Sequence, residues 1–171
     1  PESAYANLKL QTPNYSGRMD NLRASLLRPQ LTTLPQRLKR WNQLYAALVK
    51  ELSVHPLVHI PVRQPEEQYV ASSIQFSLPA LSEGPIKTFV ARCSEQGVKL
   101  EWFGAAEPNA YTSRYDSWQY LDKQPQLKQT EKVLAGLCDM RIPLTFDEAD
   151  CSLIAEIIGE VLTEVARNES T

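Results

Sequence analysis

Apolar positions along the chain follow a helical period in the first third and near the C-terminus, and a strand-like period in between. After turn-forming residues at 14–18, an Asp20 N-cap begins the first helical pattern. Pro29 is expected to kink or end this helix, and Pro35 suits the first turn of a second one. The second helix presents one apolar stripe, which we expect to pack on the chain's own core or on a second copy. The stripe consists of Leu31, Leu34, Leu38, Trp41, Tyr45, Leu48 and Leu52.

The middle of the chain predicts short strands around one helix. Residues 58–62 and 69–78 have strand patterns, and the second alternates apolar with polar side chains. A helix is expected over 85–96, with Gly97 placed to end it. A third strand is expected over 98–103.

The last third of the chain combines an aromatic-rich loop with two helices. The loop over 104–124 precedes a helix over 127–137 and a short strand over 141–144. Thr145 to Glu148 have the spacing of a capping box, and a wide apolar helical face follows. Short strands mixed with more numerous helices predict an α+β fold. In it, a small, mostly antiparallel sheet has helices packed on one face, preceded by a long N-terminal helical segment.

This order of elements suggests three parts. We expect an N-terminal arm and turn at 1–18, connecting helices at 19–53, and a small C-terminal domain at 54–171. The chain also begins at Pro1 without an initiator methionine, so we expect it to be a piece of something longer.

Composition restricts the partners and the compartment. The chain has 171 residues, 43% of them hydrophobic, and a formal charge of −2, which is typical of a globular protein. It has no basic cluster and no run of 18 apolar residues, which argues against a nucleic-acid or membrane partner. Three widely spaced cysteines predict reduced thiols and a cytoplasmic location.

The residue types that carry chemistry do not form a complete active site in the sequence. Six glycines leave no Gly-rich phosphate-binding motif. His55 and His59 flank Pro56, but no third metal ligand accompanies them, so the case for zinc is weak. Exposed aromatic residues often line binding surfaces, so the loop 111–120 is either a second core cluster or a small-ligand surface.

Three segments in the same order resemble one enzyme family. The first is Asn-Tyr-Ser-Gly-Arg-Met at 14–19, which leads into a helix and Gln30-Leu31. The second is the helix, glycine and strand at 96–103, and the third is the helix, Ile-Pro-Leu strand and closing helix from 128 onward. Together they resemble the DegT/StrS-type sugar aminotransferases, which are pyridoxal-phosphate enzymes of the fold-type-I class. The resemblance spans most of residues 12–167.

The resemblance implies that the chain is the C-terminal part of such an enzyme, including its small domain. The lysine that forms the internal aldimine would then lie on an N-terminal large domain that is missing here, so the fragment alone should be inactive and no catalytic residue is assigned. The implied cofactor is pyridoxal phosphate, held in the full-length enzyme. The implied substrate is a keto or amino sugar nucleotide or a similar ketone, and the implied assembly is a homodimer with shared sites.

The same resemblance points to the turn before the first helix as a binding element. It implies that Asn14 and Arg18 contact the cofactor and that Tyr15 and Ser16 contact the substrate. An amide and a planar cation suit an anionic group. Either Asn14 matches the family's asparagine, with a two-residue insertion, or Ser16 takes its place. The simpler alternative is an ordinary helix-entry turn.

A second functional class remains open from the sequence. The chain could be a non-catalytic α+β interaction module that dimerises through the Leu31–Leu52 stripe. Cofactor absorbance in the full-length protein separates this alternative from the aminotransferase.

Overall fold

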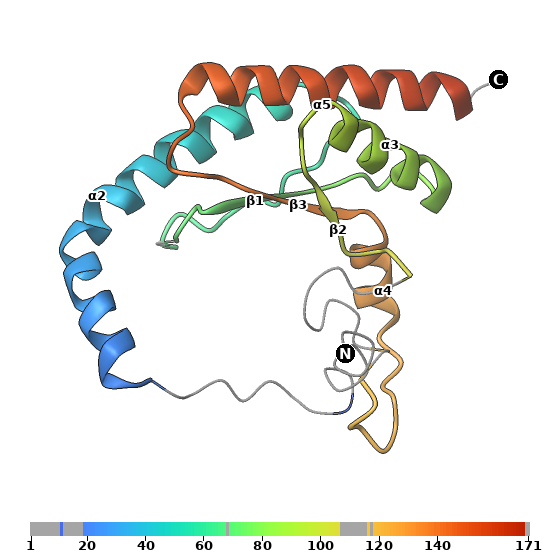
Figure 1. Ribbon diagram of the computed structural model, residues 1–171. Coiled ribbons are helices and arrows are strands. Elements are labelled where there is room, and N and C mark those ends of the chain that lie inside the picture. Colours follow the sequence, from blue (N-terminus) through green and yellow to red (C-terminus); the bar gives the residue numbers. More distant parts are fainter. Residues whose placement is uncertain (1–10, 12–18, 68, 107–115, 117, 170–171) are drawn as a thin grey trace.

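The computed structural model describes residues 11, 19–67, 69–106, 116 and 118–169. Its helices and strands form the order helix, strand, helix, strand, helix, strand, helix (Figure 1). They are α2 (Asn21–Leu52), β1 (Ser73–Ser77), α3 (Glu83–Glu95), β2 (Glu101–Trp102), α4 (Lys128–Ala135), β3 (Leu137–Arg141) and α5 (Glu148–Glu169). None of the helices in these ranges is long and apolar enough to cross a membrane.

The three strands form one antiparallel sheet in the order β1-β3-β2. β1 pairs with β3 along all five residues, whereas β2 pairs with β3 only at Glu101 and Trp102. Figure 1 shows α3 and α5 on the same side of this sheet. The predicted α+β class, with a small antiparallel sheet and helices on one face, is confirmed.

The core lies between this sheet face, α3, α5 and the second half of α2. Alternate residues of the strands point into it, which follows from the two-residue period of a strand. Fully buried side chains come from every side of the core: Ile74, Phe76, Cys138, Phe89, Ile86, Leu44, Leu48, Ile158, Val161 and Leu162.

The predicted break between two N-terminal helices is wrong, because α2 runs without interruption from Asn21 to Leu52. Pro29 and Pro35 lie inside it, and Figure 1 shows the helix bending along its length. Each proline removes one N–H and frees one carbonyl four residues earlier. Those carbonyls belong to Ser25 and Leu31, on an exposed part of the helix where water can bind them. The helix therefore bends and continues.

The apolar stripe of α2 divides into two halves with different surroundings. Tyr45, Leu48 and Leu52 are buried in the chain's own core, as the stripe predicts. In contrast, Leu31 and Leu34 are 63% and 38% exposed. The inner half of the stripe is thus occupied within one copy of the chain.

Two of the predicted strands differ from the structure because of proline. Residues 58–62, which follow Pro56 and contain Pro61, form only one bridge, His59 to Ser77, since neither proline can donate to a sheet. The strand predicted at 141–144 instead ends at Arg141, two residues before Pro143, and begins at Leu137. The preceding helix ends earlier than predicted, at Ala135.

The predicted capping box at Thr145 to Glu148 is also wrong by two residues. The structure has the reciprocal pair at Asp147 and Asp150: the Asp150 amide donates to Asp147 Oδ1, and the Asp147 amide donates to Asp150 Oδ2, both at 2.9 Å. The Phe146 amide bonds to the Pro143 carbonyl at 3.1 Å, so residues 143–146 form a turn and the helix begins after it. A carboxylate caps the first amides as well as a hydroxyl does.

The end of α3 is confirmed at Gly97. This residue has a φ of 86°, in the left-handed region that favours glycine. The amide of Gly97 bonds to the Ser94 carbonyl at 3.0 Å, and the Val98 amide bonds to the Cys93 carbonyl at 2.8 Å. This pair of bonds is a Schellman motif, which turns the chain from α3 toward β2.

Candidate functional site

The predicted binding turn, with Asn14, Tyr15, Ser16 and Arg18, lies outside the residues that the structure describes. The structure does fix the helix that follows it. Asp20 caps α2 as predicted, since its carboxylate accepts the Arg23 amide at 2.8 Å and pairs with the Arg23 guanidinium at 2.6 Å. The first turn of α2 contains no acidic residue beyond this cap.

The first half of α2 carries a broad apolar surface that no other described residue covers. Its members are exposed large hydrophobic side chains, and Met19 just before the helix adds to them: Leu22, Leu26, Leu27, Leu31 and Leu34. Figure 1 shows this half of α2 extending away from the sheet and from α5. Contiguous apolar surface of this kind marks an interaction site.

The second half of α2 is held by bonds to the segment between β3 and α5. The Trp41 indole N–H donates to the Ile142 carbonyl at 2.9 Å, and the Arg40 guanidinium donates to the Phe146 carbonyl. The Cys151 thiol on α5 also lies 3.7 Å from the Leu44 carbonyl. These contacts fix the direction in which the exposed half of α2 leaves the core.

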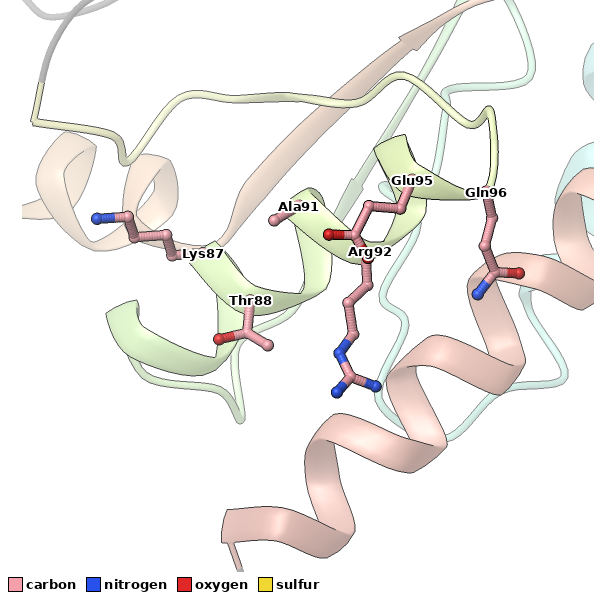
Figure 2. A pocket seen from close by; sticks show the side chains of 6 residues that line it. All are labelled: Lys87, Thr88, Ala91, Arg92, Glu95 and Gln96. Atoms are coloured by element: carbon pink, nitrogen blue, oxygen red, sulfur yellow. The ribbon is translucent and has the colours of Figure 1, made fainter.

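The outer face of α3 bears a shallow hollow of about 530 Å³ (Figure 2). All of its lining residues belong to α3 or its C-cap. Figure 2 shows Arg92 pointing toward α5, where it forms an ion pair with Glu164, while Lys87 points away. The ion pair raises the pKa of Arg92, first through its hydrogen bond to Glu164. The hollow contains no buried polar group that a ligand would satisfy.

A second cavity, of about 430 Å³, lies beside α5 at His55. The Leu57 amide donates to His55 Nδ1 at 3.3 Å, so the neutral ring carries its proton on Nε2. Nε2 lies 3.3 Å from Thr163 Oγ1, and that hydroxyl donates to the Gly159 carbonyl at 2.8 Å. Burial lowers the pKa of His55.

The two histidines do not come together with other ligands. His59 lies in its bridge to Ser77, whereas His55 bonds to α5. Within the described ranges, no group of three His, Cys, Asp or Glu side chains could hold a metal ion.

A third cavity, of about 250 Å³, opens between the chain before β2, the end of β3 and the start of α5. It is lined by both charged and apolar side chains, including Asp139, the one buried charged residue of the described part. The sequence pattern did not single out Asp139. Its only signal is a carboxylate between two apolar residues of the strand, Cys138 and Met140.

The cysteines are buried and unpaired, as predicted for small core side chains. Burial raises the pKa of Cys93 and of Cys138 to about 12, and it also raises the pKa of Cys151. Thiolate is the reactive form of cysteine, and all three thiols stay protonated at neutral pH.

The aromatic loop is described only in part. Tyr111 and Tyr115 lie outside the described residues. Trp118 and Tyr120 stack on one another with ring centroids 5.9 Å apart.

Comparison with known proteins assigns the chain to a family. The family model of the DegT/DnrJ/EryC1/StrS aminotransferases matches residues 2–158. The chain belongs to this family. The resemblance found in the sequence is therefore confirmed. No match was found among curated proteins.

Solved aminotransferase structures share the fold at low sequence identity. A 3-amino-5-hydroxybenzoic acid synthase has a TM-score of 0.69 at 18% identity, over 95% of this chain and 47% of its own. Spr1654 from Streptococcus pneumoniae, described as a putative sugar aminotransferase, has in its apo form a TM-score of 0.73 at 13% identity, over 94% of this chain and 39% of Spr1654. DesV from S. venezuelae, in complex with a ketimine intermediate, has a TM-score of 0.67 at 17% identity, over 95% of this chain and 44% of DesV. The chain therefore spans less than half the length of each.

The described residues do not fit a complete cofactor site. An anchoring lysine has to sit in an apolar pocket that lowers its pKa. Every lysine of the described part is exposed: Lys39, Lys50, Lys87, Lys99, Lys123, Lys128 and Lys132. None of these residues can serve as a cofactor anchor within this chain.

We expect His55 to make the stability of the chain depend on pH. Its pKa is lowered in the folded state, so the unfolded chain binds a proton more readily and the free energy of unfolding falls as the pH drops below the unfolded value of 6.5. Urea unfolding at about pH 7.5 and about pH 5.5 measures this loss. It should be smaller in His55→Gln. The exposed His59→Gln is the control, and an equal loss in wild type and His55→Gln would contradict the prediction.

Proposed function

We propose that this chain is the small-domain part of a pyridoxal-phosphate-dependent aminotransferase that acts on a keto or amino sugar nucleotide or a similar ketone. The family match over residues 2–158 carries this proposal. Solved relatives support the cofactor, because Spr1654 is known in forms with pyridoxal phosphate and with pyridoxamine phosphate. DesI, another structural neighbour, was determined with its TDP-sugar product, which supports the substrate class.

The lysine inventory supports a division of the active site between this chain and a large domain. All lysines of the described ranges are exposed, which supports a cofactor anchor on another part of the enzyme. We therefore propose that this chain alone is inactive. We divide it into an arm and turn at 1–18, a connecting helix at 19–53, and a small domain at 54–171.

The uncovered first half of α2 supports a docking role for this segment. Leu22, Leu26 and Leu31 are 71%, 61% and 63% exposed. A helix face that exposes several large apolar side chains is favourable in water only when another surface covers those side chains. We propose that the N-terminal large domain of a homodimeric enzyme is that surface. The inner half of the stripe is buried in the chain's own core, so it is not free to serve the alternative function of a dimerisation module.

The turn before α2 is the proposed contribution of this chain to the active site. We propose that Asn14 and Arg18 hold an anionic part of the cofactor, and that Tyr15 and Ser16 contact the substrate. A guanidinium gives two parallel hydrogen bonds to a phosphate, and an amide adds a third donor. The three buried, unpaired thiols support a cytoplasmic location for the enzyme.

The proposed activity is tested by comparing this chain with the full-length enzyme. The full-length enzyme should bind pyridoxal phosphate, with a visible absorbance band, and transfer an amino group to a keto sugar nucleotide. This chain at the same concentration should do neither. A full-length protein that shows no such band and no transfer would contradict the proposal, and so would transfer by this chain alone.

Replacing Arg18 tests the proposed turn. Arg18→Ala in the full-length enzyme should weaken binding of cofactor or substrate by about tenfold, since one charge-assisted hydrogen-bond pair is lost. Arg28→Ala removes an exposed cation from the same region of the chain and is the control. Unchanged dissociation and Michaelis constants in Arg18→Ala would remove Arg18 from the site.

Replacing the exposed leucines tests the docking role of α2. Leu26→Asp with Leu31→Asp should leave the melting temperature of this chain nearly unchanged, because both side chains are largely exposed here. In the full-length enzyme, the same pair should lower stability and dissociate the dimer in sedimentation. Leu44→Asp, which buries a charge in the core, should unfold both forms. A full-length double variant with wild-type mass and stability would overturn the docking role.

A further inference from the structure

The short pairing of β2 opens a crevice beside β3. β2 and β3 pair at Glu101 with Asp139 and at Trp102 with Cys138. Continuing this register would pair Lys99 with Arg141, but the pairing stops before them. The chain diverges there, and the cavity of about 250 Å³ lies in the gap. The edge of β3 is therefore accessible at Arg141.

Asp139 lines this crevice with a carboxylate that no neighbour neutralises. The residue is only 8% exposed, and no hydrogen bond or ion pair to another residue of the described ranges engages its side chain. Glu101 lies directly opposite on β2, which places two like charges across the strand pair. Lys99 lies 3.4 Å from Glu101 and pairs with that carboxylate. Neither carboxylate oxygen of Asp139 is fully enclosed, so the charged group opens into the crevice, where a cationic group of a ligand can pair with it.

Arg141 gives the crevice a charge of opposite sign. It lies two residues after Asp139 on β3, hence on the same face of the strand and about 7 Å away along it. Arg141 forms no ion pair with Asp139 or with any other described side chain. The crevice thus presents a free anion and a free cation at a short separation.

The crevice also has an apolar part, and it is small. Met140, Phe146 and Ile154 contribute hydrophobic surface. A volume of about 250 Å³ lies below the roughly 300–1,000 Å³ of typical ligand pockets, so a small ligand suits it better than a nucleotide. A metal ion is a poor fit, since the described residues supply no third ligand beside the two carboxylates.

We propose that this crevice binds a free α-amino acid with an aliphatic side chain. The ammonium group lies on Asp139, the carboxylate on Arg141, and the side chain against Phe146 and Ile154. This assignment concerns only described residues and does not depend on the proposed aminotransferase activity.

Calorimetric titration of the intact 171-residue chain with L-leucine tests the site. L-leucine should bind the wild type, and Asp139→Asn and Arg141→Gln should each weaken it by about tenfold or more, because each removes one charge-assisted contact. Glu95→Gln and Arg28→Gln change exposed charges elsewhere and should leave the affinity unchanged. Absence of binding at about 10 mM L-leucine, or equal binding by all variants, would overturn the proposal.

Two ligand analogues separate the roles of the two charges. 4-Methylpentanoate lacks the ammonium group and isopentylamine lacks the carboxylate, so both should bind the wild type at least about tenfold more weakly than L-leucine. Binding of either analogue as tightly as L-leucine would show that one charged end makes no contact, and would overturn the two-point site.

The stability of the ligand-free chain provides an independent readout. If Asp139 is present for a ligand, Asp139→Asn, which removes the like charge opposite Glu101, should not lower the melting temperature of the ligand-free chain. L-leucine should raise the melting temperature of the wild type but not of Asp139→Asn. A lower melting temperature for ligand-free Asp139→Asn would show that the carboxylate stabilises the fold, which contradicts its assignment to a ligand.

Discussion

The packing of the second half of α2 on α5 is the contact on which the rest of this structure depends. Leu44, Leu48 and Leu52 close the core from the side opposite the sheet. The bonds from Trp41 to Ile142 and from Arg40 to Phe146 fix α2 to the segment that leads into α5. A helix of 32 residues is about 48 Å long, so anchoring one half leaves the other half well beyond the core.

The two halves of α2 therefore have different roles, although one apolar pattern runs through both. The anchored half stabilises the small domain, and the free half carries apolar side chains to the place where the proposed binding turn begins. Pro29 and Pro35 are compatible with this arrangement, since the carbonyls that they free lie on the exposed half, where they can be hydrated. A domain that covered the free half would also fix the position of residues 14–18, which directly precede it.

In the crevice beside β3, a polar group is left for a ligand instead of being bonded within the fold. In the core of the sheet, the Trp102 indole N–H donates to the Ala135 carbonyl at 2.9 Å. The Asp139 carboxylate, in the same sheet, has no such partner among the described residues. Local departures of this kind are expected at functional sites, because a group that is satisfied by a ligand has to remain unsatisfied without it.

The sequence by itself determined the family, the α+β class, the position of α3 with its glycine cap, and the inner apolar stripe of α2. These features depend on local periodicity and turn chemistry, which are read within a few residues. Only the tertiary structure decided that α2 is continuous, that the cap of α5 is Asp147, and that β3 begins at Leu137. Each of these depends on which of several competing local bonds the packed core selects. The burial of Asp139 and its lack of a partner could not be predicted from the sequence, because both depend on how the strands around it are placed.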